Sequence, residues 1–162
     1  LKFLKSSVDN PKSVGADRIC NIISANKKYN GAKIIIDFGT ATTFDVINEN
    51  NTFIGGSIAP GIDISANYLY KKAALLRNTT FKFPEKVIGK NTKTNLQSGI
   101  MYGAVDSVEG MIKRIQNEVK FKISEVILTG GFSTIISPGL SIKHRIEKFL
   151  TLYGIYLISK IK

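Results

Sequence analysis

One stretch of the sequence combines acidic, glycine and hydroxyl residues in an order that suits phosphate chemistry. In KIIIDFGTATTFDVI, residues 33–47, a short apolar run ends at Asp37 and a second apolar run begins almost at once. We expect two strands joined by a hairpin with Gly39 at its tip, because successive backbone N–H groups in such a turn can point to one spot and bind an anion. Thr40 and the threonines after it add hydroxyl donors. The pattern therefore predicts a phosphate-binding hairpin.

Asp37 itself repels a phosphate unless a cation lies between the two. The stretch therefore predicts a carboxylate that holds a metal ion or a monovalent cation beside the phosphate. The alternative is an ordinary tight β-turn, where Asp and Gly are common for conformational reasons. Asp-Phe-Gly alone favours the turn, whereas the TATTFD that begins at Thr40 favours the phosphate site.

A second acidic residue, Asp17, lies in the motif VGADR, residues 14–18. A carboxylate within hydrogen-bond reach of an alcohol can accept its proton while the alcohol attacks phosphorus. An acidic residue is also favoured in the first turn of a helix by the helix dipole. Without further information, that structural role is the better explanation of Asp17.

Composition and charge limit the classes of protein to consider. The 162 residues are 43% hydrophobic and 22% charged, as in an ordinary globular domain with one core. We expect a cytoplasmic protein, since no apolar run approaches the roughly 18 residues of a membrane span and the single Cys20 excludes an internal disulfide. The net charge of +11 indicates an anionic partner such as a nucleotide. Its lysines are scattered, so nucleic acid is not expected.

The apolar pattern predicts an α/β domain with a mixed β-sheet flanked by helices. The longest helix is expected from Thr92 to about Val119, where apolar residues recur every three or four positions, with Thr92 or Thr94 as its cap. The other expected elements are a helix from Asn10 to about Ala25, strands at 33–38, 42–48, 52–59 and within 124–133, a helix at 62–76 and a helix at roughly 146–160.

Six motifs in one order make the sequence similar to the type III pantothenate kinase family. They are VGADR (14–18), DFGTATTFD (37–45), GGSIAPGIDIS (55–65), VIGKNT (87–92), QSGIMYGAVDSVEGMI (97–112) and LTGG (128–131). The resemblance implies a ribonuclease H-like fold of the actin and sugar-kinase superfamily. It also implies transfer of the γ-phosphate of ATP to the primary hydroxyl of pantothenate, the first step of coenzyme A synthesis.

The GADR motif carries the implied pantothenate chemistry. The resemblance makes Asp17 the catalytic base and places Gly15, Ala16 and Arg18 around the bound pantothenate. Arg18 has two possible partners, the carboxylate of the substrate or a carboxylate of the protein. Thr92 corresponds to a second pantothenate contact, although its hydroxyl also suits a helix cap.

The implied nucleotide and cation site lies in the other motifs. Asp37 corresponds to the ligand of a monovalent cation, potassium or ammonium, and Thr40, with Gly39, to the contact with the ATP phosphates. Gly130 and Gly131 correspond to the turn beneath the adenosine, or form an ordinary strand-to-helix turn. Magnesium is expected together with ATP.

The resemblance also implies a part that lies outside this sequence. The family begins with another Asp-Gly-Asn hairpin, which this sequence, starting at Leu1, lacks. We expect residues 1–30 to be the remnant of an N-terminal half and residues 31–162 to form the C-terminal ribonuclease H-like domain. We also expect little kinase activity from this chain alone. The family is typically dimeric, so a homodimer is expected, with the helix at 92–119 as the candidate interface.

Two other functions stay open. The first is an accessory transcription activator of the same fold without kinase activity, for which the positive charge would fit DNA contact. The second is a sugar kinase. The presence of Asp17, Asp37 and Thr40 together favours the pantothenate kinase over a regulator, which needs none of them. GADR and VIGKNT argue against a sugar kinase, because those loops mark the pantothenate pocket.

Overall fold

The computed structural model describes residues 4–73 and 76–160. Its elements in chain order are the 3-10 helix η1 (Pro11–Ser13), α1 (Ala16–Lys28), β1 (Lys33–Phe38), β2 (Ala41–Ile47), β3 (Phe53–Pro60), α2 (Ile62–Lys72), α3 (Thr92–Glu118), β4 (Glu125–Gly130), α4 (Ser133–Ile136), the 3-10 helix η2 (Ser137–Gly139), β5 (Arg145–Ile146) and α5 (Leu150–Ser159). Within the described ranges, no helix combines the length and apolar character needed to cross a membrane.

The five strands form one mixed sheet in the order β3-β2-β1-β4-β5. The strands β1, β2 and β3 pair in antiparallel fashion, whereas β4 runs parallel to β1 and to β5. Because β1 lies between two strands and under helices on both sides, both of its faces are apolar. This position explains the unbroken apolar run that precedes Asp37.

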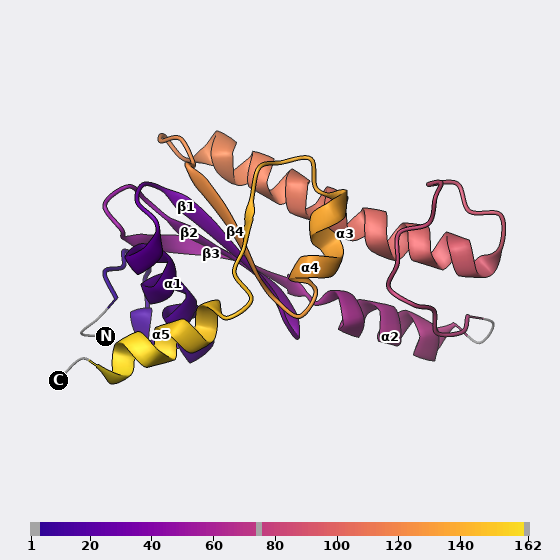
Figure 1. Ribbon diagram of the computed structural model, residues 1–162, viewed down its shortest axis with the longest axis horizontal. Helices are drawn as coiled ribbons and strands as arrows, with labels where there is room; N and C mark the ends of the chain where they lie inside the picture. Colours follow the sequence, from indigo (N-terminus) through magenta and orange to yellow (C-terminus); the bar gives the residue numbers. More distant parts are fainter. Residues whose placement is uncertain (1–3, 74–75, 161–162) are drawn as a thin grey trace.

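Helices cover both faces of the sheet (Figure 1). On one face, α1 and α5 pack their buried residues Ile22, Ala25 and Leu150 against Ile35 and Ile127 of the sheet. On the opposite face, α3 packs against the strand residues that alternate with these. The buried residues of this second cluster include Ile36, Phe38, Phe44, Met101, Val105, Val108 and Leu128. Side chains alternate along a strand, so Asp37 faces α1 whereas its neighbour Phe38 faces α3.

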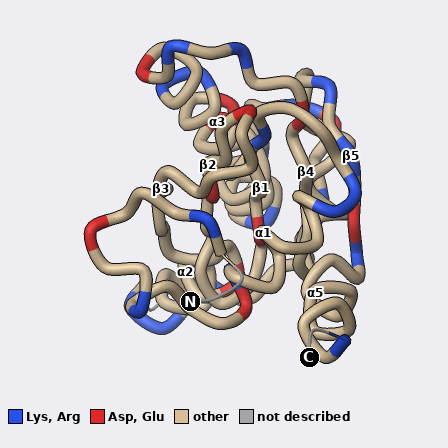
Figure 2. The backbone as a smooth tube through the Cα atoms, turned by 90° about the vertical axis from the view of Figure 1, so that its left-hand side faces the viewer, with Lys and Arg blue, Asp and Glu red and all other residues tan. Residues whose placement is uncertain are grey.

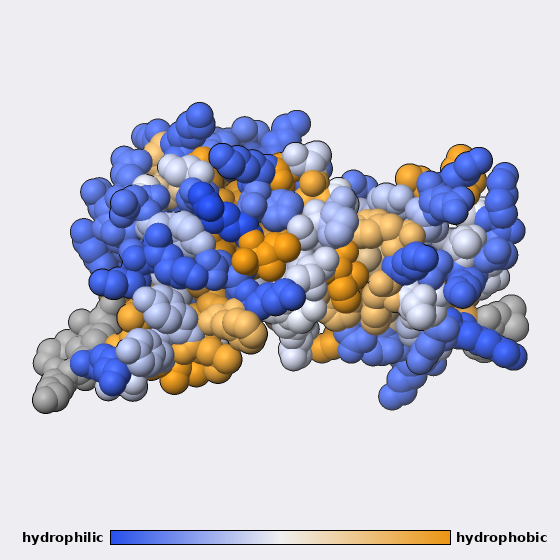
Figure 3. Space-filling model, in the orientation of Figure 1, coloured by the Kyte–Doolittle hydropathy of each residue, from blue (hydrophilic) through white to orange (hydrophobic). Residues whose placement is uncertain are grey.

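The helix α2 and the first turns of α3 extend beyond the sheet, toward the right-hand side of Figure 1. A cavity of about 720 Å³ lies between them, with walls that include Leu69, Leu96 and Ile100. Apolar residues are visible at the surface in this region in Figure 3.

The helix expected from Asn10 to about Ala25 is interrupted. Asn10 instead caps the 3-10 helix η1, and α1 begins separately at Ala16. Gly15 precedes α1 with φ −57° and ψ 145°, a conformation outside the helical region. Because of this break, Asp17 lies in the first turn of a new helix.

Three other boundaries differ from the expectations. The cap of α3 is Asn91, not Thr92 or Thr94: the Asn91 side chain accepts a hydrogen bond from the backbone of Thr94, whose hydroxyl in turn bonds to the backbone N–H of Asn91. The helix expected at 62–76 ends at Lys72; of the remaining expected positions, 74 and 75 lie outside the described residues. The C-terminal helix begins at Leu150, because residues 145–146 pair with β4 as a short edge strand.

Candidate active site at the edge of the sheet

The hairpin between β1 and β2 presents Gly39 and Thr40 to solvent. Phe38 and Thr42 are the last paired residues, and the Gly39 N–H donates to the carbonyl of Ala41 at 3.1 Å. The Gly61 N–H donates to the carbonyl of Thr40 at 3.0 Å, which ties the tip to the start of α2. The expected hairpin is therefore present, with its tip fixed and exposed.

Asp17 and Asp37 lie at the same end of the sheet. Asp17 is exposed in the first turn of α1, the helix that covers the sheet face to which Asp37 belongs. Burial is the largest cause that raises the pKa of Asp37, and the negative charge of Asp17 raises that pKa further. The Asp17 charge also raises the pKa of Asp45 in β2. Asn21, four residues after Asp17 in α1, donates a hydrogen bond to Asp37, so the helix that begins at the predicted base contacts the predicted cation ligand.

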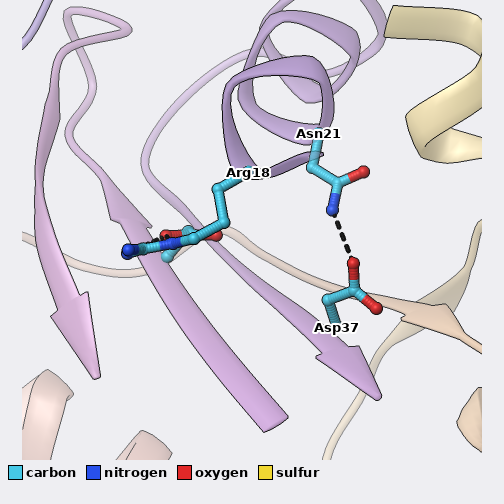
Figure 4. A network of polar contacts seen from close by, with 4 residues as sticks. Arg18, Asn21 and Asp37 are labelled. Atoms are coloured by element: carbon cyan, nitrogen blue, oxygen red, sulfur yellow. Dashed lines mark hydrogen bonds and ion pairs between the residues drawn. The ribbon is translucent and has the colours of Figure 1, made fainter. Parts of the chain in front are cut away.

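The two carboxylate oxygens of Asp37 have different surroundings. Asn21 donates from Nδ2 to Oδ2 at 2.8 Å (Figure 4), and this bond lowers the pKa of Asp37 against the effect of burial. Oδ1 lies beside Gly130, where an added Cβ would be 2.4 Å from Oδ1 and 2.6 Å from the carbonyl oxygen of Phe38. Among the described residues, no hydrogen bond is donated to Oδ1.

Two oxygen atoms meet Gly130 at this corner. A carboxylate oxygen and a backbone carbonyl oxygen flank the position that a side chain at residue 130 would fill. Gly130 also has φ +85°, a conformation that other residues adopt at a cost. Hard cations take ligands of these two types, carboxylate and carbonyl oxygen. If a monovalent cation binds beside Asp37, Oδ1 and the carbonyl oxygen of Phe38 are the ligands that this corner would offer it.

Arg18 is engaged by a carboxylate of the protein. Its Nε and Nη2 donate to Oδ1 of Asp45 at 2.9 and 2.6 Å, and the Asp45 side chain is fully buried. Burial raises the pKa of Asp45, while the hydrogen bond and charge of Arg18 lower it. Sequence analysis left two partners open for Arg18, a carboxylate of the substrate or one of the protein, and the structure shows the protein carboxylate of Asp45. The ion pair joins the first turn of α1 to β2 and so fixes the position of Asp17 relative to the sheet.

Gly15 leaves room for the Asp17 side chain, since a Cβ at residue 15 would lie 2.6 Å from Oδ1 of Asp17. Ala16 is the first residue of α1, next to Asp17, and is exposed. Gly131 is exposed too, and an added Cβ there would meet no atom within 4 Å. Gly15 and Ala16 therefore lie beside Asp17, and Gly130 lies beside Asp37.

Thr92 is not brought to this site. It lines the cavity between α2 and α3, together with Phe38 and Thr42, on the sheet face opposite α1. Figure 1 likewise shows the start of α3 at the far end of the molecule from α1. Thr92 and Asp17 of one chain therefore lie on opposite sides of the sheet.

Sequence reasoning missed three residues of this network. Asn21 follows Asp17 by four positions, so helix periodicity places both on one face. The hairpin register could have identified Asp45. Asp37 pairs with Thr43, and Asp45, two residues further along β2, lies on the same face of the sheet as Asp37. Thr151, whose hydroxyl donates to Oδ1 of Asn21 at 2.7 Å, is 130 positions away and gives no local signal.

Comparison with known proteins assigns the family. The model of the family described as type III pantothenate kinase matches residues 2–114. The chain belongs to the type III pantothenate kinase family. A family member from Sulfurihydrogenibium sp. (strain YO3AOP1), called type III pantothenate kinase, is 45% identical over 157 residues. The match covers 97% of this chain and 62% of that relative, so the chain spans less than two thirds of the relative's length.

Solved structures agree with the fold expected for this family. A Campylobacter jejuni protein described as a Baf family transcriptional activator is 23% identical, with a TM-score of 0.61 over 98% of this chain and 68% of its own. The apo ParM protein of psk41 has a TM-score of 0.54 and 15% identity, over 89% of this chain and 49% of its own. The activator of 2-hydroxyisocaproyl-CoA dehydratase from Clostridium difficile, with bound ADPNP, has a TM-score of 0.51 and 11% identity, over 96% of this chain and 73% of its own. These likenesses confirm the actin-like α/β fold alone. The division of the chain at residue 30 stays a prediction.

Proposed function

We propose that the protein to which this chain belongs transfers the γ-phosphate of ATP to pantothenate and forms 4'-phosphopantothenate, the first step of coenzyme A synthesis. The observation that carries the proposal is that, in a member of this family, the helix that begins at Asp17 bonds through Asn21 to Asp37, just before the hairpin tip at Gly39 and Thr40. Phosphoryl transfer requires from a protein mainly positioning and charge compensation, and the residues at this end of the sheet offer both.

Each part of the edge has a proposed role. Asp17 accepts the proton of the primary hydroxyl of pantothenate, since its exposed carboxylate is reachable by a substrate. The N–H and hydroxyl of Thr40, presented by the turn at Gly39, bind the ATP phosphates. Gly130 and Gly131 form the turn beneath the adenosine, where Gly131 leaves open space. A potassium or ammonium ion at Asp37, and magnesium bound to ATP, would neutralise the phosphate charge.

Arg18 is proposed to act on pantothenate through Asp17. Its Nε and Nη2 are occupied by Asp45, which is fully buried, so these nitrogens hold the helix rather than the substrate. Gly15 and Ala16 form the adjacent backbone that pantothenate contacts.

We also propose that the enzyme is a homodimer. If Thr92 contacts pantothenate as the resemblance implies, it must reach the site of a second copy, because it lies on the opposite side of the sheet from Asp17 of its own chain. The helix α3, which carries Thr92, is the proposed interface. Mixing Asp17→Asn with Thr92→Val subunits tests this arrangement: recovery of part of the activity supports it, and no recovery from two folded variants contradicts it.

The assay for the function uses this chain completed with the segment of the Sulfurihydrogenibium relative that it does not cover. ADP release is followed with ATP, magnesium, potassium and pantothenate, and the product is identified by mass. We expect turnover that depends on pantothenate, and little turnover from the 162-residue chain alone. ADP release that is independent of pantothenate, or that requires a sugar in its place, would contradict the proposal.

The transcription-activator alternative receives less support from this molecule. Lysines and arginines are spread over many parts of the chain and do not form one stripe (Figure 2). Electrostatic DNA binding would show a steep dependence of affinity on salt. We expect weak, unspecific DNA binding from the net charge of +11; tight binding to one DNA sequence would favour the alternative.

A further inference from the structure

We infer that Asn21, held in place by Thr151, is a positioning residue that fixes the orientation of the Asp37 carboxylate, so that one oxygen is turned to the catalytic site. The inference rests on the proposed function, in which Asp37 binds a monovalent cation. It assigns a role to two residues of different helices, α1 and α5, that lie outside the GADR motif.

Two hydrogen bonds connect Thr151 through Asn21 to Asp37, and in each the residue nearer Thr151 is the donor. The Thr151 hydroxyl donates to Oδ1 of Asn21 at 2.7 Å, and Nδ2 of Asn21 donates to Oδ2 of Asp37 at 2.8 Å. Because the amide oxygen is occupied by Thr151, the amide nitrogen of Asn21 is the atom that points to Asp37 (Figure 4). Asn21 itself is fully buried, so water does not compete for these bonds.

The consequence falls on the other oxygen of Asp37. With Oδ2 engaged, Oδ1 is turned to the corner between Gly130 and the carbonyl of Phe38. This is the corner where the proposed cation would meet Asp37. Without Asn21 the carboxylate could rotate about χ2 to angles at which neither oxygen is turned to that corner.

A neighbouring contact of the same kind provides a control. Ser24, one helical turn after Asn21, donates to the backbone carbonyl of Leu150 at 2.6 Å and is also fully buried. This bond joins α1 to α5 as the Asn21–Thr151 bond does, but it touches neither Asp37 nor the edge. Ser24→Ala therefore reports what simple loosening of the two helices does.

The experiment measures thermal unfolding of the protein against potassium chloride, with choline chloride keeping the ionic strength constant. A cation that binds only the folded state raises the Tm as its concentration passes its Kd. The variants are Asn21→Leu, Thr151→Val, Thr151→Ser and Ser24→Ala. Outer partners of metal ligands typically contribute about 10- to 100-fold to metal affinity.

We expect Asn21→Leu and Thr151→Val to move the potassium midpoint about 10- to 100-fold upward. Thr151→Ser, which keeps the hydroxyl, retains the wild-type midpoint, and Ser24→Ala lowers the Tm equally at every potassium concentration. Thr151→Val removes only a hydroxyl and so serves if Asn21→Leu does not fold. An unchanged midpoint in Thr151→Val, or no potassium effect in the wild type, would overturn the inference. Pantothenate-dependent ADP release by the completed enzyme tests the proposed function separately.

Discussion

The change Gly130→Ala tests the geometry of the corner beside Asp37. Gly130 has φ +85°, where an L-residue costs roughly 1–2 kcal/mol. The added methyl would also lie 2.4 Å from Oδ1 of Asp37 and 2.6 Å from the carbonyl oxygen of Phe38. Overpacking of this kind costs about 1–3 kcal/mol, because backbone must move to relieve it. We therefore expect a loss of about 2–5 kcal/mol, a large share of the roughly 5–15 kcal/mol of a typical domain.

The adjacent glycine is the matched control. A Cβ at Gly131 meets no atom within 4 Å, and the residue is exposed. Gly131→Ala should therefore change the free energy of unfolding by no more than about 0.5 kcal/mol. Both variants differ from the wild type by one methyl group in the same turn, so local position alone cannot explain a difference between them.

Urea unfolding followed by circular dichroism measures both variants, with the m-value as the check that the unfolded state is unchanged. A loss for Gly130→Ala below about 1 kcal/mol would refute the assignment of this corner as closed to any side chain. Equal losses for the two variants would do so as well, since the reasoning depends on the contrast.

Three further predictions concern buried charges. Burial raises the pKa of Asp37, so the folded state keeps the carboxyl proton of Asp37 to higher pH and loses stability as pH rises through the carboxyl range. In potassium-free buffer, Asp37→Asn should therefore be more stable than the wild type at pH 7 and should lose that advantage in acid. Burial lowers the pKa of Lys33 to about 8, so stability should increase as pH rises above that value, and Lys33→Met should flatten this rise in urea unfolding. Arg18→Met should cost about 3–5 kcal/mol by leaving Asp45 buried without its partner, and a double-mutant cycle should show that adding Asp45→Asn recovers part of the loss.

The sequence allowed prediction of those parts of the site that local patterns encode. The apolar run before Asp37, the glycine turn and the alternation in β2 identify a hairpin, and the helical spacing of apolar residues identifies α3. Local patterns were less informative at element ends. Asn91 caps α3 in place of the two candidate threonines because its side chain accepts from Thr94.

Contacts between distant segments were beyond such reasoning. The pairing of Arg18 with Asp45 depends on how α1 lies over β2, and the sequence left two partners open. The bond from Thr151 to Asn21 depends on the packing of α5 on α1, which no local pattern encodes. The position of Thr92 on the far side of the sheet likewise follows from tertiary structure, not from the motif that contains it.

Replacement of the proposed base tests the central claim most directly. Asp17 and Asp63 are both exposed acidic residues in the first turn of a helix, so a role in the helix dipole alone predicts equal effects for Asp17→Asn and Asp63→Asn. In the completed enzyme we predict that Asp17→Asn lowers kcat for pantothenate phosphorylation by about 10²- to 10⁴-fold while the Tm stays unchanged, and that Asp63→Asn leaves kcat intact. Turnover of Asp17→Asn equal to that of Asp63→Asn would contradict the account.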